Sequence, residues 1–161
     1  MRLASAVGLA IFVVGAQGCH KEPEATMMTT HSSNGLRLSL PESLPLDGVP
    51  HRLTVKQTSG GFQVTLGEAS IRRVAIVASV ALREGATAPG AWPGEREVGG
   101  RRIHYRIDRE EGGSGGSQVD FHAWEACTHG HLEYAQGDVV EEPGEPDFSL
   151  VWRVIAGTEA R

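Results

Sequence analysis

One short stretch, HAWEACTHGH, gathers most of the side chains that can bind a metal ion. It contains His122, Glu125, Cys127, His129 and His131. Zinc binds imidazole and thiolate ligands, but it needs three or four of them converging on one point. The spacing here matches no zinc finger or zinc ribbon, and the glycine between the last two histidines is typical of a turn. We therefore predict no cofactor, and keep His122, Cys127, His129 and His131 only as metal candidates.

Acidic side chains are the second group that can do chemistry. Glu110 and Glu111 are adjacent in the sequence, as are Glu141 and Glu142. On an extended chain neighbouring side chains point to opposite faces, so neither pair makes a general acid and base. The chain also lacks a nucleophile elbow, an HExxH zinc motif and a phosphate-binding loop. We predict that the protein is not an enzyme, while a catalytic pair assembled from distant residues stays an open alternative.

A protein-binding surface is the remaining kind of site that the residues indicate. Trp92 lies in a loop rich in proline and glycine, and Trp124 shares the polar side of a predicted strand. A surface tryptophan near acidic residues is a typical anchor of protein interfaces. The alternative is that each tryptophan folds back over the edge of a sheet. The predicted partner-binding residues are Glu110, Glu111, Asp120, His122, Trp124 and Glu125.

The first residues predict export from the cytoplasm. Arg2 is the only charged residue before Cys19, and an apolar run separates the two. The run is shorter than the roughly 20 apolar residues that a membrane-spanning helix needs, and small residues precede the cysteine. This pattern resembles a bacterial lipobox, so we predict a signal peptide at residues 1–18 and a diacylglyceryl group on Cys19. An uncleaved membrane anchor is the alternative.

The part that follows the signal peptide has the size of one domain. Its formal charge is 14 − 20 = −6, because Arg2 is removed with the signal. Such an acidic excess argues against nucleic acid and favours a basic protein partner. Residues 19–34 are polar and predict a flexible tether, and residues 35–161 predict a single domain. Since His20 rather than aspartate follows the cysteine, the lipobox resemblance implies an outer-membrane anchor facing the periplasm.

Most of the domain alternates apolar and polar residues with a period of two, which indicates half-buried strands. Leu36, Leu38 and Leu40 share one face of the first such segment. The most apolar segment, residues 70–85, is also compatible with a helix, but its β-branched residues favour a strand. The segments predicted as strands are 35–40, 51–58, 61–67, 70–85, 99–108, 118–127 and 131–136.

The end of the chain changes to a helical period. Phe148, Val151, Trp152 and Ile155 recur at i, i+3, i+4 and i+7, and Gly157 is typical of a helix end. We therefore predict an α+β domain. It has an antiparallel sheet of about seven short strands and a C-terminal helix packed on one face of that sheet.

Two stretches carry a resemblance to known proteins: NGLRLSLPESLPL opens the domain and PDFSLVWRVIAG closes it. With the lipobox-like start, the alternating strands and the missing catalytic motifs, they resemble small periplasmic immunity lipoproteins of the type VI secretion system. The most similar kind neutralises muramidase-type effectors. The G-x-R-x-x-x-P opening and the apolar-x-x-x-Trp pattern of the helix also resemble PsbP/DcrB-like lipoproteins.

The first resemblance implies a non-enzymatic protein that binds a toxin, encoded by the adjacent gene, and plugs its cleft. We therefore predict a lipid-anchored periplasmic immunity protein that blocks a secreted cell-wall-degrading toxin. Two alternatives stay open: a structural or assembly lipoprotein of the cell envelope, and a periplasmic metal carrier. The only membrane contact expected is through the N-terminal lipid.

Overall fold

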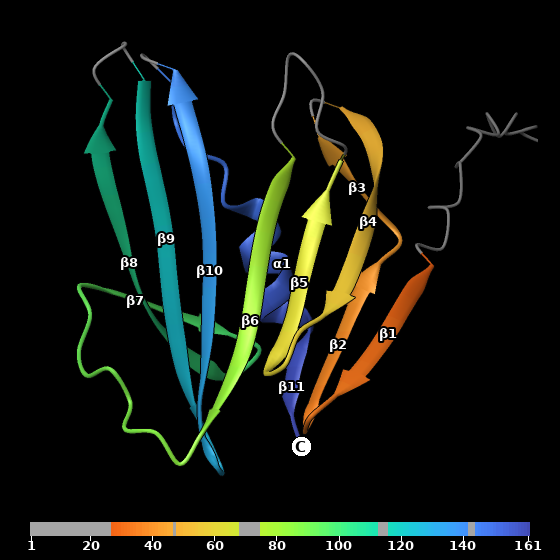
Figure 1. Cartoon of the computed structure of the whole chain (residues 1–161), viewed down its shortest axis with the longest axis vertical. Coiled ribbons are helices and arrows are strands. Elements are labelled where there is room, and N and C mark those ends of the chain that lie inside the picture. Colours follow the sequence, from red (N-terminus) through yellow and green to blue (C-terminus); the bar gives the residue numbers. More distant parts are fainter. Residues whose placement is uncertain (1–26, 47, 68–74, 113–115, 142–143) are drawn as a thin grey trace, which may run out of the picture.

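The computed structural model describes residues 27–46, 48–67, 75–112, 116–141 and 144–161 (Figure 1). The predicted signal peptide at residues 1–18 and the lipidation site Cys19 lie outside these ranges, so both stay predictions. Within the described ranges, no helix has the length and apolar character that crossing a membrane requires.

Strands dominate the described part of the chain. In chain order the elements are β1 (Met28–Ser33), β2 (Leu36–Pro41), β3 (Ser43–Leu46), β4 (Val49–Gln57), β5 (Gly61–Leu66), β6 (Ile76–Glu84), β7 (Gly94–Val98), β8 (Arg101–Glu111), β9 (Gly116–Cys127), β10 (Gly130–Glu141), α1 (Ser149–Gly157) and β11 (Thr158–Ala160). A large sheet has the order β3-β4-β5-β6-β10-β9-β8-β7, and a small sheet has the order β1-β2-β11. Every described pairing is antiparallel.

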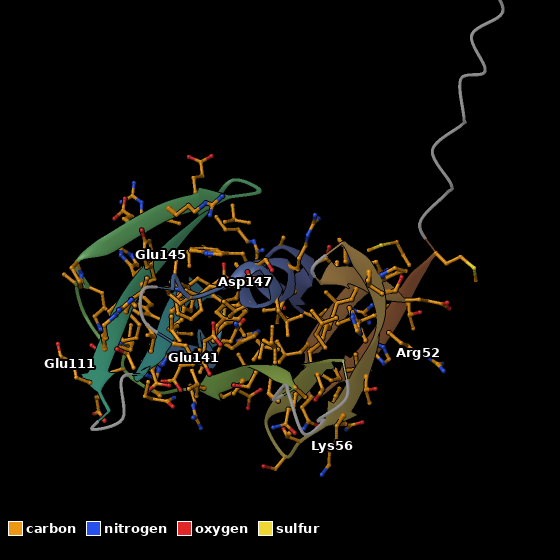
Figure 2. The ribbon with its side chains drawn as sticks, turned by 90° about the horizontal axis from the view of Figure 1, so that it is seen from above. Arg52, Lys56, Glu111, Glu141, Glu145 and Asp147 are labelled. Carbon is orange, nitrogen blue, oxygen red and sulfur yellow. The ribbon has the colours of Figure 1, made fainter. Side chains whose placement is uncertain are left out.

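The large sheet curves around α1, which lies on its concave side (Figure 2). The helix packs on β6 and β10 and on β2 of the small sheet. Alternating side chains of the strands fill the space between them, among them Phe62, Val64, Ala78, Val80, Val119, Phe121 and Ala123, each at most 2% exposed. Burial of these apolar rows is the main stabilising contribution to the fold. The predicted antiparallel sheet with a helix on one face is confirmed, although the sheet has eight strands rather than seven.

The helix follows the predicted apolar stripe. Phe148, Val151 and Ile155 are buried, and Trp152 is half-buried, with its ring edge-on to Phe121 at 5.1 Å between centroids. Gly157 ends the helix as predicted, and the close packing explains why. A Cβ atom at this position would lie 2.1 Å from the Ser39 carbonyl oxygen, so no larger residue fits against β2.

A buried glutamine holds the start of the helix to the sheet. Gln136 of β10 is 2% exposed. Its amide nitrogen donates to the Asp147 carbonyl at 2.6 Å, and its amide oxygen accepts from the Val151 N–H at 2.9 Å. The Asp147 carboxylate also accepts from the Ser149 N–H at 2.8 Å. These contacts supply partners for amides that have none within the helix.

The strands missing from the sequence prediction are the edges of the two sheets. The seven predicted segments correspond to β2, β4, β5, β6, β8, β9 and β10, and the predicted residues 70–74 lie outside the described residues. The missed strands are β1 and β11 of the small sheet and β3 and β7 of the large one. Edge strands need no continuous apolar row, and they tolerate proline, as where Pro45 pairs with Pro50. Their sequences therefore lack the alternation on which the prediction relied.

The predicted tether at residues 19–34 is too long at its C-terminal end. Residues 28–33 form β1, which pairs with β2 through a two-residue turn at Asn34 and Gly35. Both turn residues have positive φ angles, 46° and 75°. An Asn-Gly pair favours this hairpin turn because both residues tolerate such angles. The folded part of the chain therefore includes residues that precede the predicted domain start at residue 35.

Candidate functional site

Acidic side chains gather at one end of the large sheet, where β8 ends, β9 begins and β10 ends. The register places Glu111 opposite Ser117 and Glu141 opposite Gly116, on either side of β9. The backbones of the two glutamates therefore lie about 10 Å apart, since neighbouring strands are about 4.8 Å apart. The exposed residues Glu110, Glu111, Glu141, Glu145 and Asp147 form a set that we call the acidic end. Figure 2 labels Glu111, Glu141 and Glu145 on the left of the molecule and Asp147 nearer its middle, beside α1.

Asp120, another predicted contact residue, lies further along β9 and directly opposite Asp108 of β8. Like charges that face each other across a strand pair destabilise a sheet. Arg106 Nε lies 3.1 Å from an Asp108 oxygen, and Gln118 donates to Asp120 at 2.9 Å, which offsets part of the repulsion. A sheet that keeps two carboxylates in this position presents a surface suited to a cationic partner.

His122 lies in a shallow hollow of about 280 Å³ on the outer face of the sheet. The side chain of Trp92 forms part of the hollow, and the Arg106 guanidinium lies 5.0 Å from the centre of its ring. Trp92 is half-buried, so part of the ring stays accessible to a partner. Trp92 and Arg106 are far apart in the sequence, so no local pattern indicated this contact.

Trp124 is buried, with 8% of its surface exposed, which corrects the prediction of an accessible partner-binding tryptophan. The His104 ring stacks on it at 4.5 Å between centroids. The His131 ring packs edge-on against it at 6.3 Å. Alternation along a strand indicates the face on which a residue lies, but not what covers that face.

Glu125 is buried as well, so this predicted partner-binding residue is also inaccessible. Arg101 donates to its Oε1 atom at 2.7 Å, and the Tyr134 hydroxyl donates to the same oxygen. Burial raises the pKa of Glu125, while the Tyr134 hydrogen bond and the Arg101 charge oppose that rise. Burial and the nearby Glu125 carboxylate raise the pKa of Tyr134 well above 10.0, so its hydroxyl keeps the proton that it donates.

Arg101 connects this buried carboxylate to the end of the helix. Its guanidinium donates to the carbonyl oxygens of Ile155 at 2.5 Å and of Thr158 at 2.9 Å. Carbonyls at the end of a helix have no partner within it, and a cation there also complements the helix dipole. We call Arg101, Glu125 and Tyr134 the buried clamp. Its place inside the fold gives these residues a structural role.

The metal candidates are not brought together. Among the described residues, no group of three or more histidine, cysteine or carboxylate side chains has a geometry that could hold a metal ion. His129 is exposed in the turn between β9 and β10, two positions after the half-exposed free Cys127. His131 is buried, with its Nε2 atom 3.1 Å from a Glu133 oxygen, and His122 lies in the separate hollow beside Trp92.

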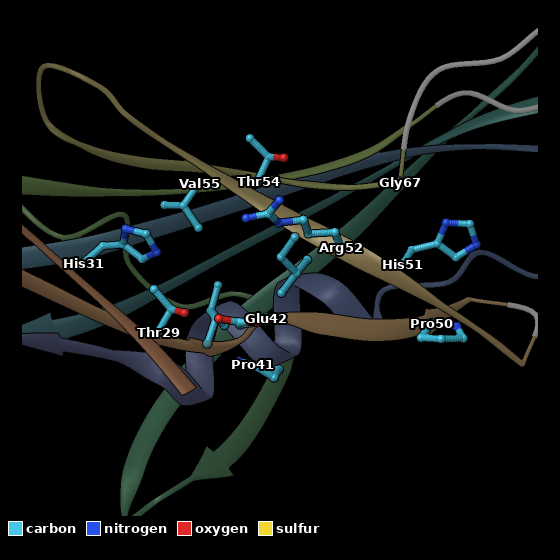
Figure 3. Close-up of a pocket in the computed structure, with 12 residues that line it drawn as sticks. Thr29, His31, Pro41, Glu42, Pro50, His51, Arg52, Thr54, Val55 and Gly67 are labelled. Carbon is cyan, nitrogen blue, oxygen red and sulfur yellow. The ribbon is translucent and has the colours of Figure 1, made fainter. Parts of the chain in front are cut away.

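A groove of about 840 Å³ between β1 and β4 is a further feature that the sequence did not indicate (Figure 3). Thr29 and His31 line it from β1, and His51 and Arg52 line it from β4. Glu42 is the one carboxylate among the described lining residues. The groove forms because β1 packs on the domain. The sequence prediction placed the residues of β1 in a tether, so it could not predict the groove.

Together these features define a class of protein: a small antiparallel β-domain that presents charged surfaces suited to protein contacts. The model of the type six secretion immunity 3 domain family matches residues 48–159, which is more than half of the chain. The chain therefore belongs to this family. It is a type VI secretion immunity protein, and its class implies that it binds a cognate toxin protein. The strands β1 to β3 lie before the matched range. No curated protein matches the chain.

Proposed function

We propose that the protein is held in the periplasm by a lipid on Cys19 and protects its cell by binding and blocking a cell-wall-degrading toxin. Membership of the immunity family supports the binding of a toxin. The muramidase-type target is supported by the sequence resemblance. Export and lipidation are supported by the residue pattern up to Cys19.

The acidic end is the surface that we propose for the toxin contact. The observation that carries this assignment is the concentration of five exposed acidic residues at the ends of β8 and β10 and in the segment before α1. A negative patch attracts a basic partner, raises the rate of encounter and fixes the orientation of docking. Of the predicted contact residues, Glu110 and Glu111 belong to this surface. Asp120 and His122 continue it along β9, and each is half-buried.

Inhibition without catalysis is part of the proposal. Glu125 and Tyr134, whose pKa values depart from the ordinary ones, act inside the fold, where they hold Arg101 and the end of the helix. A protein that blocks a cleft needs shape and charge at its surface rather than reactive groups. The arrangement of the described residues therefore fits a binder.

Mixing the purified protein with the product of the adjacent gene tests the proposed function. We expect a 1:1 complex on gel filtration and loss of the partner's peptidoglycan hydrolysis. A hydrolase of a different family, mixed in the same way, serves as the control and should stay active. Separate elution of the two proteins would contradict the proposal. A complex that still hydrolyses peptidoglycan would contradict the blocking mode.

Cys19→Ser is expected to release the protein from the membrane fraction without unfolding it, because the thiol that accepts the diacylglyceryl group is lost. Cell fractionation measures the release, and circular dichroism of the released protein checks the fold. Cys127→Ser is the matched control and should stay with the membrane. If the Cys19→Ser protein remains in that fraction, an uncleaved N-terminal anchor replaces the lipid in the proposal.

A further inference from the structure

Although the net charge of the chain is negative, one face of the domain is basic. The strands β1, β2, β4 and β5 contain no aspartate or glutamate. They carry His31, Arg37, His51, Arg52 and Lys56. Figure 2 shows Arg52 and Lys56 on the opposite side of the molecule from Glu111, Glu141 and Glu145 of the acidic end. The fold therefore separates positive from negative charge.

Two cationic side chains of this face are exposed to solvent. Arg52 and Lys56 alternate with Thr54 along the solvent side of β4, so their backbones lie about 13 Å apart. The strand next to them, β5, presents only uncharged polar residues on that side. Arg52 also stands at the groove, together with His31 and His51 (Figure 3). Since neighbouring side chains of an extended strand point to opposite faces, Arg52 and Lys56 are the cations of β4 that one anionic surface can meet together.

Exposed apolar side chains lie beside these cations. Met27 is 69% exposed and Met28 is 60% exposed, at the start of β1. Glu42 holds the Met27 backbone, since its N–H donates to the Met27 carbonyl at 3.0 Å and its carbonyl accepts from the Leu53 N–H at 2.9 Å. Met28 pairs with Pro41 of β2. The methionines therefore stand at the edge of the groove, next to the basic strand β4. Cationic and apolar side chains on one surface are the combination that binds membrane interfaces.

The covalent chain brings this face close to the predicted anchor. Met27 follows Cys19 by eight positions, and a chain of that length spans at most about 30 Å. A lipid on Cys19 would therefore hold the start of β1 near the bilayer. The acidic end lies on the other side of the molecule, and an anionic bilayer would repel it.

We propose that the basic face, made of Met27, Met28, His31, Arg52 and Lys56, docks on anionic phospholipid headgroups. Arg52, at the groove, contacts a headgroup phosphate, and the two methionines enter the interface. Docking orients the acidic end away from the membrane, toward a toxin that arrives from the cell wall. This inference rests on the proposed lipid anchor, and it adds a membrane contact made by the domain itself.

The docking is tested by hydrogen exchange of the acylated protein, residues 19–161, bound to vesicles. We expect the amides of residues 28–31 and 52–56 to exchange at least about threefold more slowly on vesicles containing phosphatidylglycerol than on pure phosphatidylcholine. High salt should abolish the difference. The double variant Arg52→Glu/Lys56→Glu should lose it. Arg102→Glu/Arg153→Glu, which makes the same change of charge on β8 and α1, should keep it.

Flotation of the vesicles distinguishes the proposed docking of the basic face from the proposed lipid anchor. Acylated protein that floats with both kinds of vesicle, but exchanges at the same rate on both, overturns the docking and leaves the anchor intact. Protein that floats with neither contradicts the anchor and the docking together. If both double variants lose the protection equally, net charge alone explains the slower exchange, and the assignment of docking to the basic face is overturned. The same protection by excess inorganic phosphate, without vesicles, would assign the groove to a free anion instead.

Discussion

Replacing Glu111 and Glu141 together by lysine is expected to slow association with the cognate toxin at least tenfold. The two residues flank β9 at the acidic end, and both are exposed. Reversing their charges turns an attractive potential into a repulsive one during encounter, so the association rate falls more than the dissociation rate rises. Stopped-flow measurements of the association rate at several salt concentrations give the effect, which should shrink as salt rises.

The matched control for this variant is Glu84→Lys/Glu97→Lys. These two glutamates are exposed on β6 and β7, away from the acidic end, and their replacement changes the net charge by the same amount. We expect the control to retain most of the association rate. Equal slowing in both variants would show that overall charge governs binding, and an unchanged rate in the first variant would place the toxin contact elsewhere.

The sequence predicted the interior of the fold well because burial imposes a period on the chain. The alternation of Leu36, Leu38 and Leu40 indicated β2, and the spacing of Val151 and Ile155 indicated the helix. Each of these patterns arises from one element facing the core, so it is visible in that element alone. The edge strands β1 and β7 have no fully buried residue, so they leave no such pattern.

Which polar residues are exposed at the surface was harder to predict, because exposure depends on contacts between elements. The alternation placed Trp124 on the polar side of β9, but His104 and His131 from the two neighbouring strands cover it. Glu125 looked like another charged surface residue until Arg101 and Tyr134 came into contact with it. Neither partner is close to it in sequence, so no local pattern contained the information.

The basic face can be recognised in the sequence when the charged residues are counted segment by segment. Between Met27 and Gly67 the sequence has three bases, Arg37, Arg52 and Lys56, against two carboxylates, Glu42 and Asp47. Most of the acidic residues follow in the later strands. A formal charge of −6 for residues 19–161 averages these two parts and points to a basic partner alone. Counting charge segment by segment separates a surface suited to a basic protein from one suited to an anionic membrane.

Arg101→Ala is expected to destabilise the protein by about 3 kcal/mol, the largest effect that we predict for a single substitution. The change leaves the Glu125 carboxylate buried without its cation, and the Ile155 and Thr158 carbonyls lose a donor. Urea unfolding followed by tryptophan fluorescence measures the free energy of unfolding. Arg102→Ala removes an exposed ion pair with Glu95 and is expected to cost less than about 0.5 kcal/mol.

A second substitution shows whether the unpaired charge causes the loss. Adding Glu125→Gln to Arg101→Ala removes the buried carboxylate and should restore part of the stability. Arg101 lies at the start of β8 and Glu111 at its end, about 33 Å apart along the strand. Folded Arg101→Ala protein should therefore bind the toxin with unchanged affinity. A loss of affinity in the folded protein, or a cost no greater than that of Arg102→Ala, would contradict a clamp that acts only on stability.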